Sequence, residues 1–230
     1  MTTTDPSQPK AASFASLPLP AATLANLEQL GYLAMTPIQA ASLPLALAGR
    51  DLIAQAKTGS GKTAAFTLPL LARLTPRRFA VQALVLCPTR ELADQVTQEI
   101  RRLARAEDNI KTLTLCGGVA LRGQLASLEH GAHIVVGTPG RILDHLSRQT
   151  LALDALNTLV LDEAGRMLDM GFAEDIAKVI AECPKTRQTL LFSATYPDGV
   201  ADLAKRFMRE PAEVKLTERQ KELLQEFEQL

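Results

Sequence analysis

Residues 51–63 read Asp51-Leu52-Ile53-Ala54-Gln55-Ala56-Lys57-Thr58-Gly59-Ser60-Gly61-Lys62-Thr63 and carry the strongest structural signal in the chain. A short apolar run opens the stretch and predicts a buried strand, and an apolar pattern with helical spacing follows it. The glycine-containing loop between them has the spacing of a phosphate-binding loop. Its backbone N–H groups and the helix N-terminus would attract phosphate, Lys62 would reach the outer phosphates, and the Thr63 hydroxyl would contact Mg²⁺. Because Ala56 replaces a glycine of the strict pattern, an ordinary turn before a helix stays an alternative.

A second signal is the run Thr158-Leu159-Val160-Leu161-Asp162-Glu163, in which apolar or β-favouring residues precede two carboxylates. It predicts a buried strand whose acids emerge at its carboxyl end, where ligands gather in open α/β sheets. In phosphate-loop enzymes an acid at this place holds Mg²⁺, and a neighbouring residue orients the attacking water. We therefore assign Asp162 to the metal and Glu163 to the water. Taken alone, the pair is also typical of a helix start.

The composition predicts one folded domain, because the chain has 230 residues of which 47% are apolar. Its 25 basic and 25 acidic side chains cancel, so the net charge argues neither for nor against nucleic acid. We find no apolar run of membrane-spanning length and no secretory signal, and expect a cytoplasmic protein. The cysteines are expected in the core and the histidines on the surface, since neither set has metal-ligand spacing. These residues are Cys87, Cys116 and Cys183, and His130, His133 and His145.

Strand-like runs alternate with helical patterns and predict an α/β fold, in which helices cover both faces of a mainly parallel sheet. We expect residues 1–13 to be disordered and residues 14–216 to form the domain. The expected strands are 51–56, 83–88, 111–117, 133–138, 158–163, 188–195 and 213–216, and the expected helices between and after them include 90–105, 119–130, 140–146, 172–183 and 200–208.

With these elements placed, the chain resembles the first RecA-like domain of the DEAD-box RNA helicases, and within that family the bacterial DbpA-type ribosomal-RNA helicases. The resemblance covers about residues 14–216. Its first motif, Gly31-Tyr32-Leu33-Ala34-Met35-Thr36-Pro37-Ile38-Gln39, matches the family's Q motif. The match implies that the Gln39 amide reads the adenine edge, that Tyr32 stacks on the ring, and that Phe14 supports the pocket. ATP or ADP, with Mg²⁺, would then bind at Phe14, Tyr32, Gln39, Ala56, Lys57, Thr58, Gly59, Ser60, Gly61, Lys62 and Thr63.

Three further family motifs each follow an expected strand, so they would share one edge of the sheet. The resemblance implies that they contact the sugar-phosphate backbone of single-stranded or structured RNA. Arginines and hydroxyls would bind phosphate, and Gly118 would allow close approach. Such contacts carry no base sequence, and DNA stays an alternative ligand because no 2′-OH preference is visible. The motifs are Pro88-Thr89-Arg90-Glu91-Leu92-Ala93, Gly117-Gly118 and Thr138-Pro139-Gly140-Arg141.

The chain departs from the family pattern at Asp162-Glu163-Ala164-Gly165, where glycine replaces the second aspartate. In the family this aspartate accepts hydrogen bonds from the coupling motif, which here reads Ser193-Ala194-Thr195. The resemblance therefore implies that nucleotide binding through Lys62, Asp162 and Glu163 is retained better than the coupling of hydrolysis to strand separation.

The resemblance also implies a second RecA-like domain, whose arginines complete the ATP site. Too few residues follow Leu216 to form it, so we expect the chain alone to be a nearly inactive part of an ATP-dependent RNA helicase. One rival hypothesis is a module that binds nucleotide and RNA without turnover. Another is an assembly scaffold, in which residues 217–230 form an amphipathic helix that packs on its own domain or binds a partner or a second copy of the chain. The apolar face of that helix would consist of Leu223, Leu224, Phe227 and Leu230.

Overall fold

The computed structural model describes residues 13–216, 221–222 and 225–226. In this part of the chain a seven-stranded sheet has the order β3-β4-β2-β5-β6-β1-β7, and all recorded strand pairs are parallel. The predicted α/β fold with a parallel sheet is therefore confirmed. The strands are β1 (Leu52–Gln55), β2 (Ala83–Leu86), β3 (Thr112–Leu115), β4 (Ile134–Gly137), β5 (Thr158–Asp162), β6 (Gln188–Ser193) and β7 (Ala212–Lys215).

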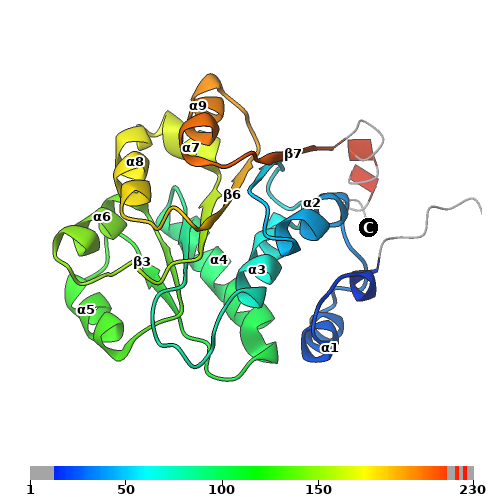
Figure 1. Cartoon of the computed structure of the whole chain (residues 1–230), viewed down its shortest axis with the longest axis horizontal. Coiled ribbons are helices and arrows are strands. Elements are labelled where there is room, and N and C mark those ends of the chain that lie inside the picture. The colour runs from blue at the N-terminus through cyan, green and yellow to red at the C-terminus, as the bar shows by residue number, and fades with distance from the viewer. Residues whose placement is uncertain (1–12, 217–220, 223–224, 227–230) are drawn as a thin grey trace, which may run out of the picture.

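Helices cover both faces of this sheet (Figure 1). The first ones are η1 (Phe14–Ser16), α1 (Ala21–Gln29), α2 (Pro37–Leu47), α3 (Lys62–Ala72), α4 (Arg90–Leu103) and η2 (Ala104–Ala106). The later ones are α5 (Leu121–His130), α6 (Pro139–Ser147), α7 (Ala164–Asp169), α8 (Ala173–Ala181) and α9 (Asp198–Phe207).

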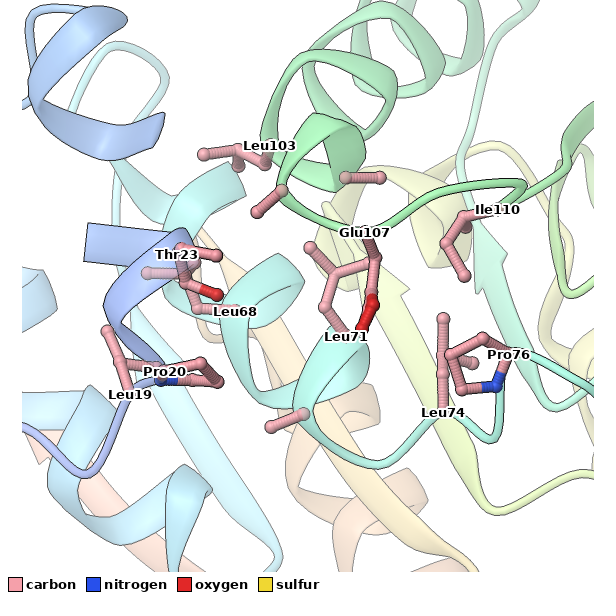
Figure 2. Close-up of a pocket in the computed structure, with 14 residues that line it drawn as sticks. Leu19, Pro20, Thr23, Leu68, Leu71, Leu74, Pro76, Leu103, Glu107 and Ile110 are labelled. Carbon is pink, nitrogen blue, oxygen red and sulfur yellow. The ribbon is translucent and has the colours of Figure 1, made fainter. Parts of the chain in front are cut away.

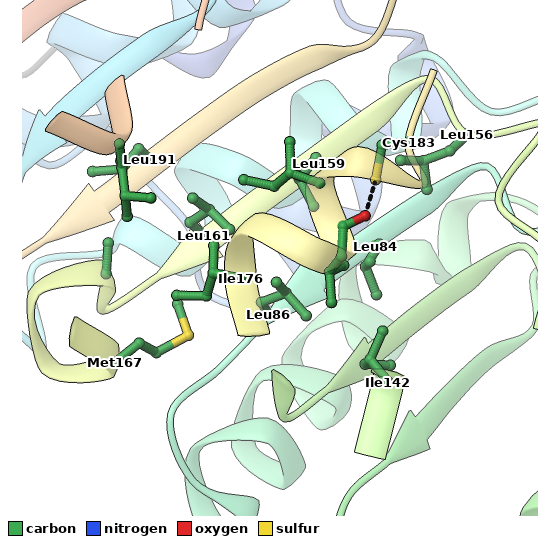
Figure 3. Packing of buried hydrophobic residues seen from close by; sticks show 14 of the residues in the cluster. Leu84, Leu86, Ile142, Leu156, Leu159, Leu161, Met167, Ile176, Cys183 and Leu191 are labelled. Carbon is green, nitrogen blue, oxygen red and sulfur yellow. Dashed lines mark hydrogen bonds between the residues drawn. The ribbon is translucent and has the colours of Figure 1, made fainter. Parts of the chain in front are cut away.

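Side chains alternate along each strand and build one core on each face of the sheet. In β2, for example, Leu84 and Leu86 join the core under α6 to α9, whereas Val85 joins the core under α2, α3 and α4. Figure 3 shows the first of these cores, in which Met167 of α7 and Ile176 of α8 pack over the strand leucines. Since both faces are covered, the inner strands β2, β4, β5 and β6 are buried over their whole length, which explains their largely apolar runs, whereas the edge strands β3 and β7 are only partly buried.

The observed strands are shorter than the predicted ones, chiefly at their carboxyl ends. The expected strand 83–88, for instance, is observed as Ala83–Leu86. In parallel sheets these ends share one edge, so each residue that leaves a strand there enters a loop of that edge. All motifs identified in the sequence except the adenine-reading one therefore meet along a single rim of the molecule.

The three histidines were all predicted on the surface, and for two of them this is wrong. His130 is exposed, but His133 and His145 are fully buried. Each buried ring has a hydrogen-bond partner for both of its nitrogens, which removes the cost of burying a polar ring. The predicted placement of the three cysteines in the core is confirmed, since all are buried free thiols.

Two predictions concern residues that lie mostly outside the described ones, namely the disordered start of the chain and the apolar face of the tail. Residues 221–222 and 225–226 are helical, but the apolar residues of that face are not described. Among the described residues, no helix combines the length and apolar character needed to cross a membrane.

Candidate nucleotide and RNA site

The phosphate loop joins β1 to α3 and is shaped by two glycines in the left-handed region. Gly59 has φ 84° and Gly61 has φ 83°, values that residues with a side chain rarely adopt. Gly61 is also confined by its surroundings, because a Cβ atom there would lie 2.6 Å from Gln39 Nε2 and 2.9 Å from Thr36 Oγ1. Glycine at position 61 therefore turns the chain into α3 and lets the start of α2 rest on the loop.

The start of α2 connects the motif at residues 31–39 to the phosphate loop. Thr36 Oγ1 and the Gln39 side chain form a capping box, in which Gln39 Oε1 accepts from the Thr36 N–H at 2.9 Å. Two more bonds reach the loop: Thr36 Oγ1 donates to the Ser60 carbonyl at 2.9 Å, and Gln39 Nε2 donates to the Gly61 carbonyl at 3.0 Å. The buried Gln39 amide therefore helps to hold the phosphate loop in place. Adenine recognition by Gln39 stays a prediction.

The two aromatic residues expected beside the adenine pack together. Phe14 is buried, and its ring meets the ring of Tyr32 edge-on with centroids 6.3 Å apart. The Tyr32 hydroxyl donates to the Glu99 carboxylate on α4, and burial together with this bond raises the pKa of Tyr32. Phe14 thus supports Tyr32, and stacking of Tyr32 on adenine stays a prediction.

Lys62 lies between the two acids that follow β5. Its ammonium is 2.9 Å from Asp162 Oδ1 and donates to the Glu163 carboxylate, and all three side chains are buried. Burial by itself lowers the pKa of Lys62, but the two carboxylates outweigh it and the pKa is raised. Burial raises the pKa of the Asp162 carboxyl, and the neighbouring ammonium opposes that rise. The residues assigned to phosphate, metal and water therefore form one cluster.

Glu163 adopts a backbone conformation that brings its carboxylate to this cluster. Its φ of 56° and ψ of 50° place it in the left-handed region, which costs a residue with a Cβ atom roughly 1–2 kcal/mol. The turn separates β5 from α7 and allows Asp162 and Glu163 to approach the same ammonium. Strain of this kind is found preferentially at functional sites.

The donor set around Asp162 fits Mg²⁺. Both Asp162 carboxylate oxygens are buried, and neither makes a hydrogen bond within the described part of the chain, although Oδ1 lies at ion-pair distance from Lys62. A buried oxygen in this condition calls for a further partner. The residues described include no cluster of three His, Cys, Asp or Glu side chains suited to a metal. Mg²⁺ commonly needs only one or two carboxylates beside phosphate and water, and Thr63 at the start of α3 can add its hydroxyl.

The motifs expected to bind RNA follow β3, β4 and β2, which are neighbours in the sheet. Arg90 is exposed at the start of α4, and a Cβ atom on Gly118 would lie 4.0 Å from its Nη1 atom. Gly118 has φ 78°, a left-handed backbone conformation that favours glycine, whereas the space around it would admit a Cβ atom. Two members of the set, Pro88 and Pro139, are buried and shape the turns. Thr89, Arg90, Gly117, Gly118, Thr138, Gly140 and Arg141 are exposed or half-buried along this part of the rim.

The coupling motif closes over the glycine that replaces the family aspartate. Ser193 Oγ accepts a hydrogen bond from the Gly165 N–H at 3.0 Å, and both residues are buried. A Cβ atom on Gly165 would overlap Thr195 Oγ1 and lie 2.8 Å from Ser193 Oγ. The two hydroxyls expected to meet a carboxylate thus occupy its place, while Ala194 is exposed beside them.

A hollow of about 200 Å³ lies away from these groups, between α1, the second half of α3 and η2 (Figure 2). Most of the side chains that line it are apolar, among them Leu19, Leu71 and Ile110. The phosphate loop adjoins the opposite end of α3, so this hollow is no part of the nucleotide site.

Comparison with known proteins agrees with this geometry. The family model for DEAD/DEAH box helicases matches residues 36–203. The chain belongs to the DEAD/DEAH box helicase family. It is 60% identical over 198 residues to the ATP-dependent RNA helicase DbpA of Escherichia coli, which covers 86% of this chain and 43% of that protein. It is 48% identical over 204 residues to the DEAD-box ATP-dependent RNA helicase CshA of Bacillus cereus, which covers 89% of this chain and 39% of that protein.

A solved structure supports the RecA-like fold. The DEAD box protein of the hyperthermophile Methanococcus jannaschii superposes with a TM-score of 0.85 at 42% identity, over 89% of this chain and 56% of that one. The chain spans about two fifths of the length of the DbpA and CshA helicases. The activity of a whole DEAD-box helicase is accordingly a proposal for this chain.

Two features of this DEAD-box domain were missed in the sequence. Thr36 contacts the phosphate loop, and the Thr-x-x-Gln spacing of a capping box could have indicated that it is ordered. Gln124 is buried and accepts a hydrogen bond from Arg141, and nothing in the sequence distinguishes it from an ordinary polar residue of a helix.

Proposed function

We propose that this chain is the nucleotide-binding and RNA-binding first domain of an ATP-dependent RNA helicase, which hydrolyses ATP when joined to a second RecA-like domain. The observation that carries the proposal is the buried cluster of Lys62, Asp162 and Glu163 beside the phosphate loop. Lys62 would bind the outer phosphates, and Asp162 with Thr63 would hold Mg²⁺, which neutralises phosphate charge when bound. Glu163 would orient the attacking water.

Calorimetric titration with ADP and GDP in the presence of Mg²⁺ tests the nucleotide part of the proposal. We expect weak binding of ADP and weaker binding of GDP, because the Gln39 amide offers the donor and acceptor that adenine requires. Equal affinities would contradict adenine reading by Gln39. Single-turnover hydrolysis with RNA, measured with and without a second family domain, tests the catalytic part, and we expect appreciable turnover only with that domain.

A module that binds without turnover is the second candidate, and Gly165 is the observation that favours it. The coupling hydroxyls of Ser193 and Thr195 meet a glycine rather than a carboxylate. If the chain with a second domain binds ADP and RNA but hydrolyses no ATP, even with RNA present, this candidate is the correct one.

Three finer assignments have different grounds. Ribosomal RNA as the target rests on the resemblance to DbpA-type helicases. A cytoplasmic location rests on the sequence pattern, and self-association through residues 217–230 rests on the apolar spacing of that segment. Competition between a ribosomal RNA fragment and an unrelated RNA of equal length tests the first. Sedimentation with and without residues 217–230 tests the last.

A further inference from the structure

Gln124 is a buried amide that joins the two motifs after β3 and β4. It lies on α5, and its Nε2 donates to the Cys116 carbonyl at 3.1 Å. Its Oε1 accepts from Arg141 Nη1 at 3.1 Å and lies 2.8 Å from His145 Nε2, both on α6. One side chain thus connects the strand end before Gly117 to the helix that carries Arg141.

The hydrogen-bond partners admit only one orientation of this amide. A guanidinium can only donate, so the atom facing Arg141 must be the oxygen. The amide NH₂ group then faces the Cys116 carbonyl, which can only accept. His145 Nε2 must therefore carry a proton. Turning the amide over would set donor against donor and acceptor against acceptor.

His145 is suited to stabilise this orientation. It is fully buried, and burial followed by the nearby Arg141 charge lowers its pKa, although Asp144 opposes the shift. A neutral imidazole has one proton, and Gln124 requires it on Nε2. Nδ1 is then unprotonated, and the Thr150 hydroxyl faces two acceptors, this nitrogen at 2.8 Å and the His145 carbonyl at 3.1 Å.

The arrangement uses only one end of the Arg141 guanidinium. Nη1 donates to Gln124 and, at 3.1 Å, to the Val119 carbonyl. Nη2 and Nε make no hydrogen bond in the described part of the chain, and Arg141 is half-buried rather than covered. A phosphate accepts two parallel N–H bonds from such an edge. Gln124 and Val119 also line a hollow of about 470 Å³ that Arg90 borders.

We propose that Gln124 is a positioning residue, which holds Arg141 with its Nη2 and Nε atoms available to an RNA phosphate, and that His145 fixes the Gln124 amide for this purpose. The inference deepens the proposed function and rests on it, because it takes Arg141 as a phosphate contact. A guanidinium held on one side loses little further side-chain freedom when it binds phosphate.

Gln124→Met tests the inference in the full chain, since methionine keeps the unbranched shape and removes both hydrogen-bonding groups. We expect the affinity for a short oligouridylate, followed by fluorescence anisotropy, to fall roughly three- to tenfold. Affinity for ADP should stay unchanged. The order parameter of the Arg141 Nε–H group, measured by NMR relaxation, should fall. In an Arg141→Ala background, Gln124→Met should have no further effect on RNA affinity.

That double-mutant comparison separates positioning from a merely structural role. If Gln124 only stabilised α5 and the Gly117-Gly118 turn, its loss would weaken RNA binding equally in the Arg141→Ala background, and the inference would be wrong. Gln124→Glu serves as the second variant should Gln124→Met unfold. The glutamate keeps an acceptor for Arg141, but its negative charge compensates the charge of the guanidinium. We therefore expect a high order parameter for the Arg141 Nε–H group together with weakened RNA binding. A low order parameter would contradict the inference.

The outcomes also separate this inference from the proposed function. If Arg141→Ala weakens RNA binding while Gln124→Met does not, the RNA track stands and the positioning role fails. If Arg141→Ala leaves RNA binding unchanged, the assignment of Arg141 to RNA and the inference fail together.

Discussion

The two halves of the functional rim handle charge in opposite ways. At the end of β5, Lys62, Asp162 and Glu163 are buried and neutralise one another within the fold. At the ends of β2 and β4, Arg90 is exposed, with its Nε 3.9 Å from the exposed Asp94 carboxylate, and Arg141 is half-buried. A buried ion pair depends on the correct partner and is strongly affected by the loss of one member, whereas exposed cations act additively and are screened by salt. The difference is in keeping with the proposal that the first half binds a nucleotide and the second half an RNA backbone.

The largest expected effect is that of Lys62→Ala at the nucleotide half. Removing the ammonium deletes the charge that would bind the outer phosphates, and hydrogen bonds to charged groups contribute about 1.5–3 kcal/mol each. We expect ADP affinity to fall by about a hundredfold in a calorimetric titration. The variant also leaves two buried carboxylates without their cation, so the free energy of unfolding should fall by about 3 kcal/mol.

Lys178→Ala is the matched control for this prediction. Lys178 is exposed on α8 and its ammonium lies 3.1 Å from the Glu174 carboxylate, so the same deletion removes only a surface ion pair. Both ADP affinity and stability should stay close to those of the parent. Unchanged ADP affinity in folded Lys62→Ala would contradict the assignment of the phosphate loop.

A smaller effect is expected at the RNA half from the combined substitution Arg90→Ala and Arg141→Ala. Each arginine that contacts a phosphate releases bound cations from the RNA, so binding weakens with the logarithm of salt concentration. For a short oligouridylate, the slope of log affinity against log salt concentration should become shallower by about 1.4, which is the contribution of two single-strand phosphate contacts. Stability should change little, because Arg90 is exposed and Arg141 is only half-buried.

The control for the arginine pair uses the far ends of the same helices. Arg102 near the end of α4 and Arg148 after α6 form local ion pairs with Glu99 and Asp144. Replacing both with alanine gives the same change in net charge but should leave the salt dependence unchanged. A slope that shallows equally in both double variants would mean that RNA responds to net charge and not to the proposed track.

Much of the nucleotide half could be predicted because its signals are local in sequence. The strand, loop and helix around Lys62 lie within one continuous stretch, and the acids follow directly after an apolar run. Parallel pairing then brings both to one rim by a general rule of α/β sheets. The capping box of Thr36 and Gln39 is also a local sequence signal. The bonds from these two side chains to the phosphate loop, however, depend on how α2 packs and cannot be predicted from that spacing.

The RNA half was less predictable because its supporting contacts join elements that are distant in sequence. Gln124 and His145 are separated by 21 residues and meet only because α5 and α6 lie side by side (Figure 1). A lone histidine is exposed more often than not, so the wrong placement of His145 followed the ordinary preference of a polar ring. What overrides that preference is a pair of partners supplied by the fold, Gln124 and Thr150.

The smallest expected effect on ligand affinity concerns the junction between the halves, at Gly165. Any side chain there must displace the hydroxyls of Ser193 and Thr195, because a Cβ atom would overlap Thr195 Oγ1. Thr195 is exposed and can rotate away, and an aspartate carboxylate could then accept from both hydroxyls. We therefore expect Gly165→Asp to be more stable than Gly165→Ala by about 1.5–3 kcal/mol in urea unfolding, the value of a hydrogen bond to a charged group.

Gly165→Asn separates hydrogen bonding from charge at this position, since a carboxylate near the start of α7 also gains about 0.3–1 kcal/mol from the helix dipole. If the hydroxyl bonds account for the difference, asparagine should recover part of it, and if only the dipole acts, asparagine should resemble alanine. ADP affinity should be alike in all three variants, because the new group lies beside Ser193 and Thr195 and not at the phosphate loop. With a second family domain supplied, Gly165→Asp should raise RNA-stimulated ATP turnover more than Gly165→Asn, since a carboxylate accepts hydroxyl hydrogen bonds more strongly than an amide oxygen. Equal turnover in the parent and in Gly165→Asp would show that glycine serves the junction as well as aspartate does, and the two halves of the rim would then be coupled by other contacts.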